Sequence, residues 1–133
     1  MCIRDSFNRH QRGHLIRAAQ EGIAFSFFYG MEIMQEMGVN LSLIRAAKAN
    51  LFLSPIFRET LAGVSGSAIQ LYNTDGAIGA ARGAGLGLGL YANAEEAFDK
   101  LRVVGETAPD ALNRAEVQDA YQRWKAALLT QIR

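Results

Sequence analysis

The segment from Ile44 to Phe52, IRAAKANLF, holds the residues whose types and spacing are best suited to binding a ligand. Small side chains directly after a strand let a ligand approach the backbone, and the Ser54-Pro55 pair that follows is a strong helix start. The first turn of such a helix offers free N–H groups and the positive end of the helix dipole to an anion. The carboxyl end of a strand is also where α/β folds bind ligands. The spacing alone fits an ordinary strand-to-helix connection equally well.

Three other motifs carry weaker signals for chemistry. His10 and His14 lie four residues apart, a spacing that zinc can use on a helix, but no third ligand is nearby and we expect no metal site. Cys2 lacks the partner base and the ordered setting that a nucleophile needs. The run from Gly87 to Ala92 fits GxGxxA, yet it does not open a helix directly after a strand, so a dinucleotide fold is disfavoured.

The hydrophobic pattern predicts helices that alternate with short strands, and hence an α/β layer fold. Helices are expected from His10 to near Gly38, from Pro55 to Val64, from Gly76 to Tyr91, from Asn93 onward and from Arg114 to Ile132. Strands are expected over Leu41 to Ile44 and Ala68 to Tyr72, with a brief extended piece at Leu101 to Val104. Since two strands make only a marginal sheet, the domain should be helix-rich with a short, incomplete sheet.

Two helices should each bury one apolar stripe, because their apolar residues recur at spacings of three and four. On the first helix the stripe consists of Leu15, Ile16, Ala19, Ile23, Phe27, Met31 and Met34, and on the last of Val117, Tyr121, Trp124, Leu128 and Ile132. The segment from Gly76 to Tyr91 is different, because it contains six glycines, each of which costs an interior helix position about 0.5 to 1 kcal/mol relative to alanine. We expect it to be a buried helix whose side chains stay small because it packs closely against a sheet or another helix.

Composition narrows the class of protein further. The chain has 133 residues, with 14 Lys and Arg against 13 Asp and Glu, which is typical of one ordinary domain. The net charge of +1 gives no electrostatic footprint for nucleic acid. No apolar run is long enough for a membrane span and no secretory signal is present, so we expect a cytoplasmic protein.

The order of these motifs resembles the C-terminal domain of the FGGY carbohydrate kinases, and within them the xylulokinase-like branch. The resemblance covers roughly His14 to Leu129 and is carried by HLIRAAQEGIAFSF, AxANLF after a strand, FRETLAG, and a glycine-rich helix containing GAA. It implies part of an actin-like, ribonuclease-H-like ATPase domain. In this family ATP with Mg²⁺ lies in the cleft between two domains, and its phosphate is transferred to a sugar hydroxyl.

The family's adenosine motif, approximately GGxxxN, falls on Arg45 to Asn50 in this resemblance. It implies that Ala46, Ala47 and Asn50 contact the nucleotide, with Ser54 at the helix start as a further nucleotide-binding residue. The chain departs from the motif at Arg45-Ala46, where Gly-Gly is usual.

The family's DxGT phosphate segment, its sugar-binding residues and its catalytic aspartate all precede the matching region, so no catalytic residue is expected here. Residues 10–133 are interpreted as the nucleotide-side, C-terminal domain fragment of a pentulose kinase that converts D-xylulose to D-xylulose 5-phosphate. Residues 1–9 are interpreted as a disordered or artefactual tail. The implied partners are ATP or ADP, a sugar and the missing N-terminal domain, and a homodimer stays open. The alternative is a non-catalytic, helix-rich protein-interaction module whose apolar helix faces dock on a partner.

Overall fold

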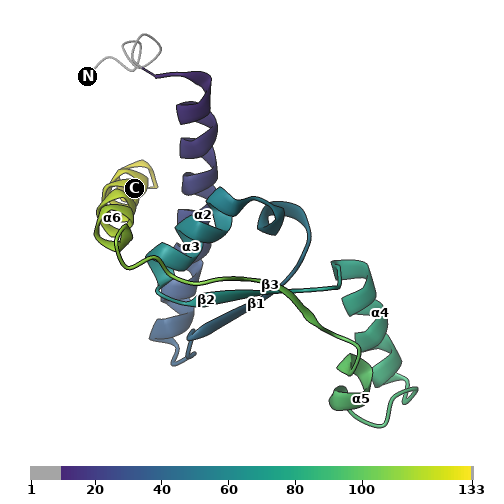
Figure 1. Ribbon diagram of the computed structural model, residues 1–133. Coiled ribbons are helices and arrows are strands. Elements are labelled where there is room, and N and C mark those ends of the chain that lie inside the picture. Colours follow the sequence, from purple (N-terminus) through teal and green to yellow (C-terminus); the bar gives the residue numbers. More distant parts are fainter. Residues whose placement is uncertain (1–9, 133) are drawn as a thin grey trace.

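The computed structural model describes residues 10–132, in which a small sheet carries helices on one face (Figure 1). A short segment with two helices, residues 76–98, extends from one end of the sheet, and we call it the helical arm. The expected tail at residues 1–9, and Cys2 within it, lie outside the described residues. The elements in chain order are α2 (Arg12–Glu36), β1 (Leu43–Ala47), the 3₁₀ turn η2 (Asn50–Leu53), α3 (Pro55–Ser65), β2 (Ala68–Tyr72), α4 (Gly76–Gly87), α5 (Ala94–Phe98), β3 (Val103–Thr107) and α6 (Arg114–Gln131). The fold is therefore α/β and helix-rich with a short sheet, as the sequence predicts.

The sheet has the order β1-β2-β3, with β1 parallel to β2 and β3 antiparallel to it. Its central strand, β2, has the predicted bounds and the predicted alternation, because Ile69 and Leu71 are buried whereas Gln70 and Tyr72 are half-buried on the other side. We call that second side the open face of the sheet. The register adds Arg45 and Ala47 of β1 to this face, opposite Gln70 and Tyr72 respectively.

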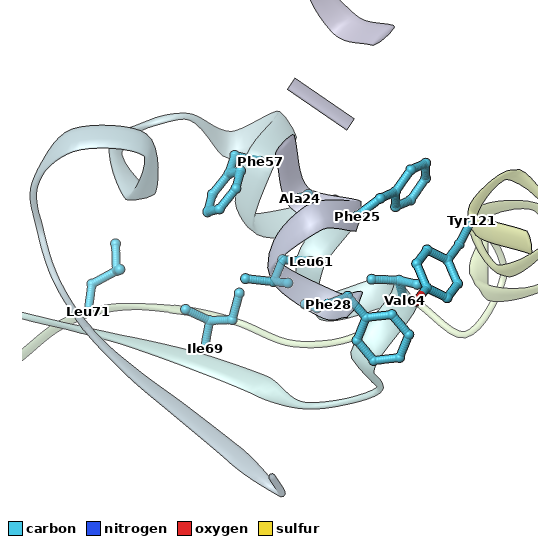
Figure 2. Packing of buried hydrophobic residues seen from close by; sticks show 10 residues of the cluster. Ala24, Phe25, Phe28, Phe57, Leu61, Val64, Ile69, Leu71 and Tyr121 are labelled. Atoms are coloured by element: carbon cyan, nitrogen blue, oxygen red, sulfur yellow. The ribbon is translucent and has the colours of Figure 1, made fainter. Parts of the chain in front are cut away.

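The core lies between the other face of the sheet and helices α2, α3 and α6 (Figure 2). Aromatic rings meet there edge to face, with ring centroids 5.2 Å apart for Phe52 and Phe57 and 4.9 Å apart for Phe28 and Tyr121. Phe57, Leu61, Ile69 and Tyr121 are its largest fully buried side chains. Burial of such side chains stabilises a fold by roughly 1.5 to 3 kcal/mol each.

Helix α3 begins and ends where the sequence predicts. The Ser54 hydroxyl accepts a hydrogen bond from the N–H of Phe57, and Pro55 occupies the first helical position. At the other end Gly66 takes a left-handed conformation with φ of 70°, which only glycine adopts freely.

Two strand predictions are corrected by the structure. The first strand runs from Leu43 to Ala47 and not over Leu41 to Ile44, because Ala46 and Ala47 pair with Leu71 and Tyr72 of β2. The expected extended piece at Leu101 to Val104 is a full third strand, Val103–Thr107, whose pairing with β2 supplies its hydrogen bonds.

The predicted stripe on the first helix is also largely wrong. Leu15, Ile16, Ile23, Phe27 and Met34 are all exposed by more than a third, and the buried residues of α2 are instead Ala24, Phe25 and Phe28. The helix is apolar around most of its circumference near residues 23–34, so the positions of α3 and α6 decide which face is covered. The stripe on α6 is partly right, since Tyr121 is buried but Ile132 is 64% exposed.

The glycine-rich helix α4 forms but ends at Gly87 and not at Tyr91 as predicted, and it is not buried. In Figure 1 it lies with α5 at the far end of the sheet from α2, α3 and α6. Gly85 is its one buried residue, and a Cβ added there would meet the ring of Tyr91 at 2.7 Å. Added Cβ atoms at Gly76, Gly79, Gly83 and Gly87 would meet nothing within 4 Å, so close packing within the described chain does not explain these glycines.

A charged cluster joins α2 to α6. The buried Tyr121 hydroxyl donates to the Glu32 carboxylate, and Lys125 Nζ lies 2.7 Å from the same Glu32 oxygen. Burial, followed by the hydrogen bond to Glu32, raises the pKa of Tyr121, and its hydrogen bond to Glu32 raises the pKa of Lys125. Both groups therefore keep their protons in the folded chain at pH values where the unfolded chain releases them.

Stability should fall as the pH rises above about 10, the ordinary pKa of tyrosine and close to that of lysine. Below that pH both the folded and the unfolded chain keep these protons, and the two groups contribute their full stabilisation to the fold. Above it the unfolded chain releases the protons more readily than the folded chain, so this stabilisation is lost. Urea midpoints at pH 8, 10 and 11 measure the effect. The loss between pH 8 and pH 11 should be smaller in Tyr121→Phe than in the parent chain, and an equal loss in both would contradict this assignment.

Candidate functional site

A cavity of about 430 Å³ lies where β1 and β2 end, and its other wall consists of the end of α5 and the segment that follows it. Its described lining residues are Arg45, Ala46, Ala47, Tyr72, Thr74, Phe98 and Leu101. The wall is thus mainly small, aliphatic and aromatic, with one guanidinium and two hydroxyl groups. Such a composition suits a flat, partly apolar group with polar atoms on its edge.

The small side chains at this edge belong to the end of β1 and to the turn after it. Ala46 and Ala47 are the last two residues of β1, and the chain then turns tightly with Lys48 N–H bonded to the Tyr72 carbonyl at 3.0 Å. Asn50 opens η2 with φ of 52°, a left-handed conformation that asparagine tolerates better than most residues. The carboxyl ends of two parallel strands therefore form one edge of the cavity, and this turn follows directly after that edge.

The opposite wall is held in place by Asn73, the first residue after β2. Its side-chain oxygen accepts a 2.7 Å hydrogen bond from the N–H of Arg102, and its own N–H donates to the Arg102 carbonyl at 3.1 Å. These bonds fix the return of the chain from the helical arm to β3. They hold Phe98 and Leu101 beside the ends of β1 and β2.

The four sequence-predicted site residues divide into two pairs. Ala46 and Ala47 line the cavity, whereas Asn50 and Ser54 are not among its lining residues. Asn50 is exposed in the turn directly after the strand, and within residues 10–132 its side-chain amide has no hydrogen-bond partner. The Ser54 hydroxyl already caps α3 and donates to the Gln20 side chain, which gives it a structural task.

Sequence reasoning missed Tyr72, Thr74, Phe98 and Leu101. Tyr72 and Thr74 could have been found, because they stand at the carboxyl end of a correctly predicted strand. Phe98 and Leu101 carry no such local signal, since a chain reversal of about 30 residues brings them to the cavity.

Two negative observations concern the described part of the chain. Residues 10–132 contain no group of three or more His, Cys, Asp or Glu side chains placed to hold a metal ion, and His10 and His14 only touch ring edge to ring face. Among the helices of this same range, none combines the length and the apolar character needed to cross a membrane.

Comparison with known proteins gives a consistent set of relatives. No protein-family profile matches the chain. The L-xylulose/3-keto-L-gulonate kinase of Escherichia coli K12 is 34% identical over 119 residues, which cover 87% of this chain and 24% of the kinase. A glycerol kinase of Thermoanaerobacter sp. X514 is 33% identical over 122 residues, covering 89% of this chain and 24% of that protein.

A solved structure of a sugar kinase has a similar fold. The crystal structure of xylulose kinase from Rhodospirillum rubrum matches 91% of this chain and 25% of its own, with a TM-score of 0.67 and 23% sequence identity. The chain thus spans about a quarter of the length of the curated relatives it matches, and its fold is that of part of a xylulose kinase.

Proposed function

We propose that this chain, a relative of the FGGY carbohydrate kinases, contributes the adenosine-binding wall of an ATP-dependent sugar kinase. The proposed reaction is phosphorylation of a pentulose, with D-xylulose converted to D-xylulose 5-phosphate. The kinase names of the relatives support the reaction class, and the L-xylulose named for one of them supports a pentulose as the sugar. Cytoplasmic ATP would be the phosphoryl donor, and the missing N-terminal domain would close over it.

The observation that carries the proposal is the cavity at the ends of β1 and β2. The small side chains of Ala46 and Ala47 leave space at this wall, so that a ligand can approach the backbone. Tyr72 and Phe98 offer aromatic surface to a purine, and the Thr74 hydroxyl offers a hydrogen bond to its polar edge or to the ribose. Catalysis of phosphoryl transfer is mostly positioning and charge stabilisation, and this wall would supply positioning.

Mg²⁺ would come with the nucleotide, and the general base would come from another part of the full protein. The described carboxylates form no cluster able to hold a metal, so Mg²⁺ would arrive with the nucleotide phosphates. When bound, Mg²⁺ neutralises charge on the transferred phosphoryl group.

The first test is binding of MgADP by the purified chain, measured by isothermal titration calorimetry. Asn50→Gly should weaken binding about tenfold, the effect of losing one hydrogen bond to the ligand. Glycine is the suitable replacement because it accepts the left-handed conformation of residue 50, whereas alanine would add strain at φ of 52°.

Ser54→Ala is the matched control for that test. It should lower the stability of the chain by about 1 kcal/mol through the lost cap, while leaving the affinity for MgADP unchanged. Absence of MgADP binding in a chain with the expected helical circular dichroism would overturn the proposed nucleotide site.

A second prediction concerns activity. Purified residues 1–133 should not phosphorylate D-xylulose with MgATP, because the proposed general base and sugar contacts belong to the missing part of the kinase. A coupled assay for ADP release measures this. Turnover above the rate without protein would contradict the proposed division of labour.

A protein-interaction module remains the second candidate, because large apolar side chains are exposed on and beside the helical arm. Ile78, Leu88 and Leu90 are 44%, 79% and 74% exposed. If the arm docks on a protein partner and the cavity has no ligand, the folded chain will not bind MgADP. The calorimetric experiment therefore separates the two candidates.

A further inference from the structure

Arg45 is the one charged residue among the described residues that line the cavity, and it stands where the resemblance to the FGGY kinases implies a glycine. It lies in the middle of β1 on the open face of the sheet, paired in register with Gln70 of β2. Ala47 and Tyr72 lie on the same face, one step nearer the strand ends. A ligand that rests against Tyr72 thus lies beside Arg45.

Within residues 10–132 the Arg45 guanidinium forms no ion pair and no hydrogen bond, unlike those of Arg17, Arg58 and Arg123. Its side chain is exposed and therefore free to bind a ligand in the cavity. Arginine presents five N–H donors in a planar fork and no acceptor, so it selects a partner with two adjacent acceptors.

Purine bases differ in this respect. Guanine presents the acceptors O6 and N7 side by side, which match the arginine fork, whereas adenine presents N7 beside an amino donor. A glutamine can recognise adenine with its oxygen and its nitrogen together. The oxygen of Gln70 already accepts a hydrogen bond from the Tyr72 hydroxyl at 3.2 Å, which leaves Gln70 poorly placed for that task.

We propose that Arg45 is a specificity-determining residue of the nucleotide pocket and gives it affinity for guanine nucleotides in addition to adenine nucleotides. This inference rests on the proposed nucleotide site. It assigns a role to the departure of this chain from Gly-Gly: the guanidinium adds a contact to the edge of the base. The phosphoryl donor class is accordingly purine nucleoside triphosphates and not ATP alone.

The test is calorimetric titration of the full chain with MgADP and with MgGDP, in the parent chain, Arg45→Gly and Arg45→Gln. The ratio of the two dissociation constants is the readout, because a general change in stability affects both titrations alike. Arg45→Gly should lower the preference for MgGDP about tenfold, within the range found for bidentate contacts to base edges. Arg45→Gln should shift the preference toward MgADP at least as far. Arg123→Gln, which removes an exposed arginine of α6 paired only with Asp119, is the control and should leave the ratio unchanged.

Three other outcomes separate the two proposals. An unchanged ratio in both Arg45 variants, with binding retained, would overturn the role of Arg45 while the nucleotide site stands. Binding of MgADP with no measurable binding of MgGDP by the parent chain would do the same. Failure of the folded parent chain to bind either nucleotide would overturn the nucleotide site and the role of Arg45 together.

Discussion

Phe57→Ala is expected to destabilise the chain by about 3 to 5 kcal/mol, which is a large part of the total stability of a domain of this size. Phe57 is fully buried, and its ring packs against Phe27 and Phe52 with centroids 5.5 and 5.2 Å apart. Removal of the ring loses its burial and leaves a cavity where η2 and α2 meet α3. Urea denaturation followed by circular dichroism at 222 nm measures the change.

Leu112→Ala is the control for this prediction, because Leu112 is 91% exposed and its removal leaves no cavity. Its cost should not exceed about 0.5 kcal/mol. A loss of less than about 1 kcal/mol in Phe57→Ala would mean that the packing of η2 on α3 is not formed in solution. Since η2 follows β1, whose end lines the cavity, the proposed nucleotide site would then lose its support as well.

The parts of the fold that follow from local chemistry could be predicted from the sequence. Ser54-Pro55 and Gly66 bound α3 because a cap, a fixed φ and a left-handed glycine act within a few residues. The strand Ala68–Tyr72 follows from alternation, and Asn93 opens α5 by accepting from the N–H of Glu96 at 2.9 Å.

The parts that depend on distant partners could not be predicted. Ala46 and Ala47 are poor strand formers that become extended because β2 lies beside them, and Gly105 enters β3 for the same reason. The buried face of α2 is chosen by contact with α3 and α6, and not by the most regular apolar stripe.

The candidate site shows the same division. Ala46 and Ala47 could be proposed from the sequence because the motif is continuous along the chain. Phe98 and Leu101 are held at the cavity by the hydrogen bonds between Asn73 and Arg102. No local sequence pattern predicts these hydrogen bonds. At the proposed site, recognition of the ligand would therefore depend on a wall that the motif does not include.

Ala47→Trp should abolish binding of MgADP, with affinity lowered at least about a hundredfold, while the chain stays folded. Ala47 points from the end of β1 toward the open face, and an indole there would occupy the space that the proposed base needs. The same substitution at Ala46 would be a poorer test, because Ala46 packs against the core and a large side chain there would overpack it.

Ala68→Trp is the matched control, because Ala68 lies on the same open face at the opposite end of β2 and does not line the cavity. Both variants place an indole on the half-buried side of the sheet, so they should change the urea midpoint to a similar extent. Only Ala47→Trp should lose MgADP in calorimetric titration. Equal binding by the two variants would mean that the nucleotide does not use the ends of β1 and β2, because an obstruction at that edge would then be without effect. Loss of binding in Ala47→Trp alone would assign the ligand to this edge independently of Asn50 and Arg45.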